Sequence, residues 1–135
     1  MALELEIDKQ APDFVVARLR GDLDADTCIA ADPQLHEASA GLPARSTFVF
    51  DLTHLEYISS AGLRSIFRVR KALKAAGGQA VLKNPQPQVR KVFDIVKAIP
   101  VSEVFTSDAE LDAYLDTMQR RAREDADEDL DSIAF

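Results

Sequence analysis

The feature that most constrains the fold is a strand-like run followed closely by an amphipathic helical pattern, between Thr47 and Gly78. Residues 47–52 (TFVFDL) are β-branched, aromatic and nearly all apolar, which is typical of a central strand covered on both faces. Over residues 61–76 apolar side chains recur at helical spacing, and basic side chains fall mostly on the other side. Gly77-Gly78 is a typical signal for the end of a helix. A buried strand that leads into such a helix predicts an α/β domain.

The rest of the chain continues this alternation of strands and helices. Residues 3–7 (LELEI) alternate apolar and acidic side chains as a half-buried strand does, and residues 14–19 form a second apolar run. The short break between them predicts a hairpin. The order of elements predicts a mixed β-sheet packed by about four helices. The remaining predicted elements are a weak helix over Cys28–Ala40, a strand over Gln79–Leu82, a helix carrying Val89, Val92, Phe93 and Val96, a short strand over Val101–Phe105 and a helix over Ala109–Met118.

The length of 135 residues suits one domain that folds without disulfides or metals. Beyond Arg120 acidic residues dominate, and there are too few apolar side chains to pack against a core. We therefore predict a domain over residues 1–118 and a disordered acidic tail over residues 119–135.

Composition excludes several function classes. The single cysteine, Cys28, cannot form an intramolecular disulfide or a multi-thiolate metal site. No apolar run approaches the roughly 20 residues that span a bilayer, and the N-terminus lacks the basic start and apolar core of a secretory signal. The net charge of −7 argues against direct binding to nucleic acid, which needs a basic surface. We expect a soluble cytoplasmic protein that binds neither nucleic acid nor membrane.

Two adjacent serines, Ser59 and Ser60, stand at the start of the central helix. Ser60 is placed as a structural N-cap, which would stabilise the helix by about 1 kcal/mol. However, neither serine is followed three residues later by Glu or Gln, as a capping box requires. Gly62 in the first turn costs roughly 0.5–1 kcal/mol relative to alanine, and is tolerated where another backbone or a ligand approaches closely. A phosphate here would meet free N–H groups and the positive end of the helix dipole.

The segment DLTHLEYISSAGLR resembles the phosphoacceptor segment of the STAS-domain anti-sigma factor antagonists. Matched position by position, Ser60 takes the place of the phosphoacceptor, and Gly62 and Leu63 form the Gly-Leu pair that follows it. Ser59 falls where many members carry Asp, so it is the second choice as acceptor. The resemblance thus implies a phosphorylation site at the start of this helix.

A second segment, RLRGDLDADTC, resembles the strand-end Gly-Glu/Asp-Leu-Asp motif of the same family. This match implies that Gly21, Asp22 and Asp24 lie beside the phosphoacceptor loop. The later strand, proline break and helix also follow the family pattern, so the resemblance covers about Leu3 to Leu115. It implies a single STAS-like domain.

The resemblance implies a partner switch, with no catalytic residue, cofactor or metal in this chain. The unphosphorylated antagonist binds an anti-sigma factor, which is itself a serine kinase, and thereby frees a sigma factor for transcription. Phosphorylation at Ser60 ends the binding, and a separate serine phosphatase restores it. The implied partner-binding residues are Asp22, Asp24, Ser59, Ser60, Ala61, Gly62, Leu63, Arg64 and Arg68.

Two alternatives remain open at this point. The first keeps the fold but makes the chain a non-phosphorylated STAS adaptor or scaffold in a signalling or transport complex. The second is a small metal-dependent phosphohydrolase that would use Asp22 and Asp24. His36 and His54, the two histidines, are far apart in sequence and lack neighbouring ligands, which argues against a histidine metal site.

Overall fold

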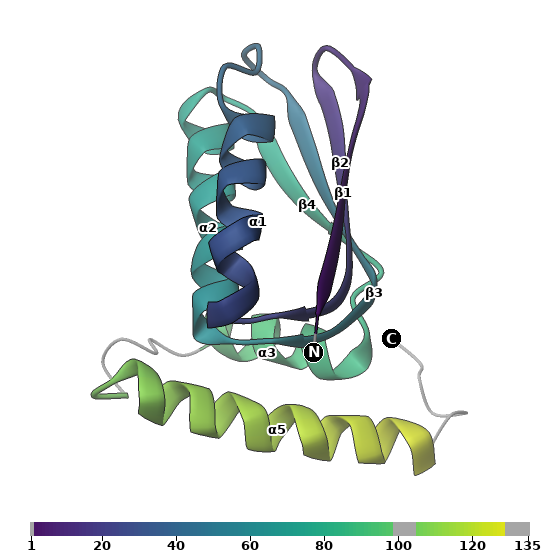
Figure 1. Cartoon of the computed structure of the whole chain (residues 1–135), viewed down its shortest axis with the longest axis vertical. Coiled ribbons are helices and arrows are strands. Elements are labelled where there is room, and N and C mark those ends of the chain that lie inside the picture. The colour runs from purple at the N-terminus through teal and green to yellow at the C-terminus, as the bar shows by residue number, and fades with distance from the viewer. Residues whose placement is uncertain (1, 99–104, 129–135) are drawn as a thin grey trace.

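The computed structural model describes residues 2–98 and 105–128. Within them a four-stranded mixed sheet has the order β1-β2-β3-β4 (Figure 1). Strand β1 runs antiparallel to β2, and the β2–β3 and β3–β4 pairs are parallel, which confirms the predicted hairpin and mixed sheet. The strands are β1 (Leu3–Ala11), β2 (Phe14–Leu23), β3 (Thr47–Ile58) and β4 (Gln79–Lys83).

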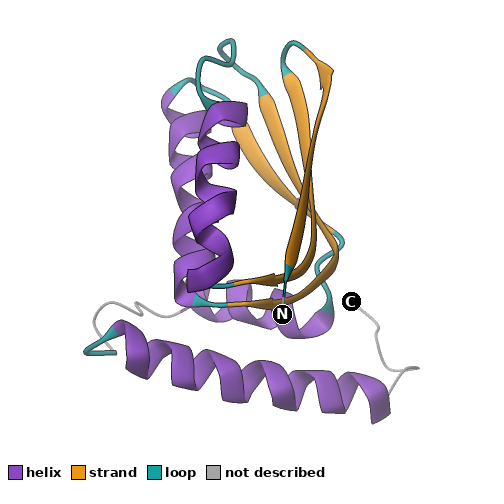
Figure 2. Ribbon diagram, viewed as in Figure 1, coloured by secondary structure: helices purple, strands orange, loops and turns teal. Residues whose placement is uncertain are grey.

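The helices form two groups (Figure 2). Helices α1 (Ala25–Ser39) and α2 (Ser60–Ala75) pack together on one face of the sheet. Helices α3 (Pro87–Ala98) and α5 (Asp108–Glu128) lie at the end of the domain where α1 and α2 begin. The predicted α/β architecture, with helices packed on a mixed sheet, is confirmed.

The hydrophobic core lies between the sheet and the pair α1 and α2. Phe48 and Phe50 of β3 are fully buried against the helices, and Val49 on the opposite face is also buried, although no helix of the pair α1 and α2 covers that face. The apolar stripe predicted for α2 faces this core through four buried residues: Leu63, Ile66, Val69 and Leu73.

Several elements are longer than the sequence predicted, and β3 and α5 exceed their predicted ends by the most. Strand β3 continues six residues past the predicted end at Leu52 and leads almost directly into α2. Helix α5 continues ten residues past Met118, so it crosses the predicted boundary between domain and tail. The reason is that Gln119 and Ala122 are buried against the domain. Their packing keeps this segment helical although it has few apolar residues.

Some predictions fall on residues 99–104 and 129–135, which lie outside the described residues. They include most of the short strand predicted over Val101–Phe105 and the end of the acidic tail. Phe105 itself is described and is not in a strand. None of the helices within the described ranges is long and apolar enough to cross a membrane.

Candidate functional site

The two motifs of the sequence meet where β2 and β3 end. These parallel strands are in register there, so that Leu23 lies beside Ile58. The N–H of Ser59 donates a hydrogen bond of 3.0 Å to the carbonyl of Leu23. A Cβ atom at Gly62 would lie 2.5 Å from that same carbonyl oxygen. Gly62 is therefore required by the close approach of another backbone, which is one of the two reasons that the sequence suggested.

The N-cap of α2 is Ser59, so the prediction that Ser60 caps this helix is wrong by one residue. The Ser59 backbone is still extended (φ −97°, ψ 177°), and its Oγ accepts a hydrogen bond from the Gly62 N–H at 3.3 Å. Ser60 is the first helical residue. Local sequence could not distinguish the two serines, because the position of the cap depends on how far β3 pairs with β2.

The hydroxyl of Ser60 is buried. The residue is 2% exposed, and no described residue offers its Oγ a hydrogen bond. It lines an open pocket of about 350 Å³ between α2, Val96 of α3, residues 105–107 and the start of α5. A buried polar group left unsatisfied costs about 1–3 kcal/mol, so such groups often mark functional positions.

Helix α5 covers the loop that carries Ser60. The Ser60 N–H donates a hydrogen bond of 2.8 Å to Asp112 Oδ1. The side-chain amide of Gln119 accepts from the Ile58 N–H at 3.0 Å and donates to the Ile58 carbonyl at 2.8 Å. Arg123 donates to the carbonyl of Glu56. Three polar side chains of one helix thus hold the main chain at the end of β3.

Sequence reasoning missed these α5 residues. Asp112 and Gln119 lie more than 50 positions beyond the loop that they contact. The one signal in the sequence is periodicity, because Asp112, Gln119 and Arg123 recur on the same helical face as buried Leu115. That signal predicts a packed face but not its target.

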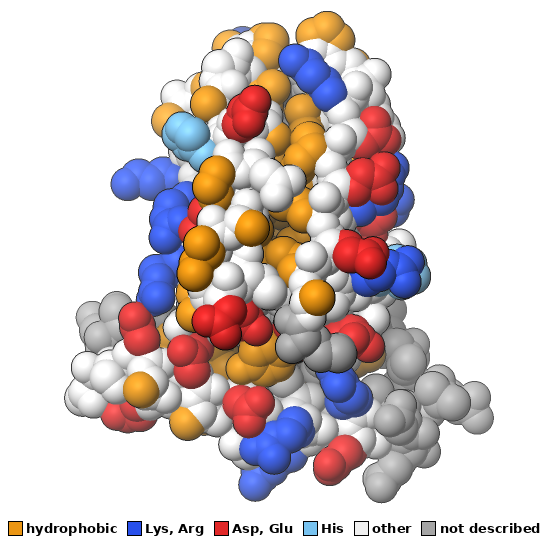
Figure 3. All heavy atoms as spheres, viewed as in Figure 1, with side chains coloured by type: hydrophobic (Ala, Val, Ile, Leu, Met, Phe, Trp, Pro, Cys, Tyr) orange, Lys and Arg blue, Asp and Glu red, His pale blue; other side chains and the backbone are white. Residues whose placement is uncertain are grey.

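Acidic side chains gather at this end of the molecule, along α5 and where it meets the body (Figure 3). The pKa of Tyr57 is raised to about 12, mainly because the side chain is partly buried and next because the carboxylates of Asp116 and Asp112 lie nearby. Arg64 on α2 pairs with Asp108 of α5 at 3.0 Å, and both side chains are exposed. Arg68, one turn further along α2, pairs with Asp32 of α1 at 3.2 Å. The basic side of α2 is therefore partly paired within the chain.

Asp24 has a structural role as the N-cap of α1. Its carboxylate accepts hydrogen bonds of 3.0 Å from the N–H groups of Asp26 and Thr27, and the Thr27 hydroxyl accepts from the Asp24 N–H at 2.9 Å. This reciprocal pair is a capping box. The engagement of this carboxylate disfavours the phosphohydrolase that would use Asp22 and Asp24.

The residues predicted to bind a partner lie along the end of β2 and the first turns of α2, but their exposure differs. Arg64 and Arg68 are exposed, whereas the residues nearest Ser60 are largely covered. The covered set comprises the buried Ser59, Ser60, Gly62 and Leu63 and the half-buried Asp22, Asp24 and Ala61.

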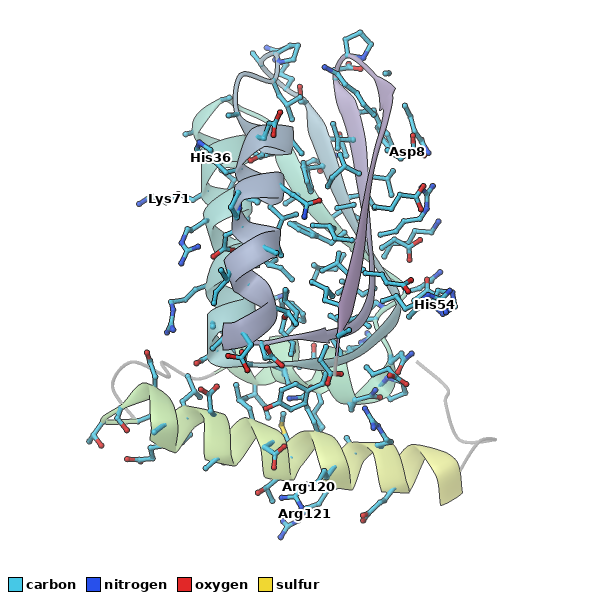
Figure 4. The ribbon with its side chains drawn as sticks, in the orientation of Figure 1. Asp8, His36, His54, Lys71, Arg120 and Arg121 are labelled. Atoms are coloured by element: carbon cyan, nitrogen blue, oxygen red, sulfur yellow. The ribbon has the colours of Figure 1, made fainter. Side chains whose placement is uncertain are left out.

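The histidines do not form a metal site with each other. His36 lies on α1 and His54 on β3, on opposite sides of the domain (Figure 4). Among the described residues, no group of three or more His, Cys, Asp or Glu side chains is placed to hold a metal ion.

Comparison with known proteins identifies the family of this chain. Residues 6–111 match the STAS domain family. The chain belongs to that family. Over 59 residues it is 44% identical to BtrV of Bordetella bronchiseptica, which is assigned to the anti-sigma factor antagonists; the match covers 44% of this chain and 51% of BtrV. Over 93 residues it is 28% identical to the anti-sigma F factor antagonist of Lysinibacillus sphaericus, covering 67% of this chain and 77% of that protein.

This STAS domain also resembles solved structures of the Bacillus antagonist SpoIIAA. The unphosphorylated form superposes with a TM-score of 0.62 at 26% identity, over 70% of this chain and 81% of that one. The phosphorylated form gives a TM-score of 0.58 at 26% identity, over 69% and 83%. The STAS fold is thus confirmed. The match to BtrV spans about half of that protein's length.

Proposed function

We propose that this STAS domain is an anti-sigma factor antagonist in a partner-switching pathway of the cytoplasm. Its unphosphorylated form binds an anti-sigma factor that is a serine kinase, and this binding releases a sigma factor. The kinase phosphorylates Ser60, which abolishes the binding, and a serine phosphatase restores it. The chain is a ligand and a kinase substrate in this cycle and performs no catalysis.

The observation that carries this proposal is the state of the two hydroxyls at the start of α2. Ser59 Oγ is engaged as the N-cap, whereas Ser60 Oγ has no hydrogen-bond partner among the described residues. Modification of Ser60 would therefore leave the cap of α2 intact. The relatives named as antagonists, one of which is known in a phosphorylated form, support the same role.

The switch follows from the charge of a phosphate group. Phosphorylation adds about −1.5 to −2 charges at neutral pH. Within the domain, the N-terminus of a helix favours an anion by about 0.3–1 kcal/mol, and Arg64 lies one turn away. At a docked interface the same group meets bulk and a desolvation cost, and each 1.4 kcal/mol or so lowers affinity about tenfold. A few kcal/mol are enough to end the binding.

The first test is phosphosite mapping by mass spectrometry on protein from its native cells, in growth and under stress. We expect a phosphate on Ser60 whose occupancy changes with condition. A phosphate on Ser59 would support the same mechanism with Ser59 as the phosphoacceptor. Absence of phosphate from both serines in every condition would contradict the switch.

The second test is binding of variants to the kinase partner recovered from the same cells. Ser60→Ala should bind persistently, and Ser60→Asp should bind at least tenfold more weakly. Gln34→Asp adds the same charge on the exposed face of α1 and should leave affinity unchanged. Equal affinities for Ser60→Ala and Ser60→Asp would rule out the switch.

A non-phosphorylated STAS adaptor is the second candidate, and the burial of Ser60 favours it. Such a protein would co-purify in a complex of fixed stoichiometry. It would carry no phosphate at either serine under any condition, which is the outcome that separates it from the antagonist.

A further inference from the structure

The hydroxyl that the proposed switch needs is buried, and the chain's own helix α5 binds the backbone N–H of the same residue. Ser60 is 2% exposed, and α5 lies across the end of the domain at which Ser60 sits (Figure 1). A kinase must bring the γ-phosphate of ATP into line with the acceptor oxygen, so that the Oγ–P bond forms while the bond to the leaving ADP breaks and the hydroxyl proton passes to a base of the kinase. The hydroxyl is too deeply buried for that approach while α5 is docked beside it through Asp112.

The contacts of α5 lie on the groups that would hold a phosphate. A phosphate on Ser60 would be bound by N–H groups at the start of α2 and by the guanidinium of Arg64. The Ser60 N–H is bonded to the carboxylate of Asp112 at 2.8 Å, and Arg64 is paired with Asp108 at 3.0 Å. Both carboxylates belong to α5. Docked α5 therefore places negative charge where the phosphate charge would go.

We propose that α5 is a displaceable cover of the phosphoacceptor, and that docked α5 and a phosphate on Ser60 exclude each other. This inference rests on the proposed function only in taking Ser60 as the acceptor. A phosphate with docked α5 would have to share the Ser60 N–H with Asp112 and would face several like charges in a partly buried site. Release of α5 removes these carboxylates and frees Arg64 for the phosphate.

Coupling of this kind is reciprocal. If a phosphate on Ser60 weakens the docking of α5, then docking of α5 weakens phosphorylation by the same factor at equilibrium. Helix α5 also covers Ile58 through Gln119, so a partner could contact the buried residues at the start of α2 only in the open form. The cover thus controls access of both the kinase and the partner.

The contacts that hold α5 are suited to release. Its polar anchors, Asp112, Gln119 and Arg123, bind backbone groups that water can satisfy once the helix leaves. Its apolar face packs mainly on α3, and its Leu115 and Met118 join the hydrophobic core, so release of α5 also has to expose these two side chains. The pairing of β1, β2, β3 and β4 involves no residue of α5. The sheet can therefore stay intact while α5 opens.

The first experiment uses the full chain with phosphoserine installed at position 60 during translation. Hydrogen exchange read by mass spectrometry should show at least tenfold faster exchange of the α5 amides than in the unmodified chain, with unchanged protection of β2 and β3. Phosphoserine installed in place of Lys71, exposed on the same helix α2 (Figure 4), is the matched control and should not change α5. Protection of α5 equal to that of the unmodified chain would overturn the proposal.

The second experiment measures opening without any phosphate. A Ser60→Cys variant is labelled with a thiol reagent, and the label is located by peptide mass spectrometry. Adding Asp108→Asn and Asp112→Asn should raise the labelling rate at position 60 at least tenfold. Asp116→Asn is the control, because Asp116 pairs with Arg120 of its own helix at 3.0 Å, and it should leave the rate unchanged.

In the labelling assay, Cys28 serves as an internal reference. The Cys28 thiol is buried, and burial raises its pKa, so it should label slowly in every variant and report any general unfolding. An unchanged rate at position 60 in the double variant would overturn the cover. Neither experiment uses a cellular kinase or partner. Absence of Ser60 phosphate in cells would therefore refute the proposed function alone, and persistent α5 protection would refute the cover alone.

Discussion

At the residue scale, Ser59 and Ser60 are adjacent and chemically identical, yet their hydroxyls serve different ends. Ser59 closes the start of α2 by accepting the Gly62 N–H. Ser60 makes no side-chain hydrogen bond to the described residues, although it is just as deeply buried. The first hydroxyl contributes to stability, whereas the second, buried and unsatisfied, costs stability.

Alanine substitutions should separate these two roles. Ser59→Ala should lower the free energy of unfolding by about 1 kcal/mol, because it removes an N-cap. Ser60→Ala should leave it unchanged or raise it by up to about 1 kcal/mol, because it removes an unsatisfied buried hydroxyl. Urea unfolding of both variants measures the difference. Equal losses would contradict the assignment of Ser59 as the cap.

Substitution of Gly62 by alanine tests the close approach of β2, because helix propensity and steric clash predict opposite changes in the free energy of unfolding. From helix propensity alone, Gly62→Ala should stabilise the protein by about 1 kcal/mol. The added Cβ would lie 2.5 Å from the Leu23 carbonyl and 2.8 Å from the Ile58 side chain. We therefore expect a loss of about 1–3 kcal/mol, as for other overpacked sites, measured by urea unfolding. A gain in stability would show that the two motifs are not tightly joined here.

At the scale of elements, α5 is held by a mixture of apolar packing and side-chain bonds to backbone. Leu115 and Met118 pack in the core, and Gln119 bonds both backbone groups of Ile58. This explains why the helix persists across residues 119–128, which have few apolar side chains. The predicted end at Met118 was based on where apolar residues become rare, and a buried glutamine cannot be predicted from that pattern.

Gln119→Ala should destabilise the protein by about 2 kcal/mol, because it leaves two backbone groups of Ile58 without partners in a buried position. Gln34→Ala is the matched control, since Gln34 is exposed and bonds only within its own helix α1. That control should change the free energy of unfolding by less than about 0.5 kcal/mol. Similar small effects for both would show that α5 is not anchored through Gln119.

At the scale of the whole molecule, charge is distributed unevenly. Acidic side chains from the end of β2 and from α5 converge on the region of Tyr57, at the end of the domain where α2 begins. A phosphate added there increases an existing excess of negative charge. Release of α5, as proposed above, would relieve that excess, because α5 brings several of the carboxylates.

Tyr57 reports this environment through the pH dependence of stability. Its pKa is about 12 in the folded protein against an ordinary value of 10.0. The folded state keeps a proton that the unfolded state releases, so the stabilising contribution is complete below pH 10 and is lost as pH rises towards 12. Urea unfolding across this range should show a steeper fall for the natural protein than for Tyr57→Phe. Parallel curves would place Tyr57 in an ordinary aqueous environment.

The sequence by itself determined the type and order of most elements. The apolar run at Thr47 predicts a central strand, the period of the following segment predicts α2, and both depend on residues near one another in the chain. Gly62 marked a close approach before any neighbour was known, because a glycine in a first helical turn needs a reason. The two motifs at the ends of β2 and β3 indicated the family, and the match over residues 6–111 confirms it.

Only the tertiary structure decided which serine caps α2, where β3 and α5 end, and what covers Ser60. Each of these depends on residues distant in sequence. Pairing with β2 extends β3 to Ile58 and thereby makes Ser59 the cap. Asp112 and Gln119 reach that loop across more than 50 positions. Local pattern specifies which elements form, whereas the contact of one element with another specifies where they stop and which hydroxyl stays free.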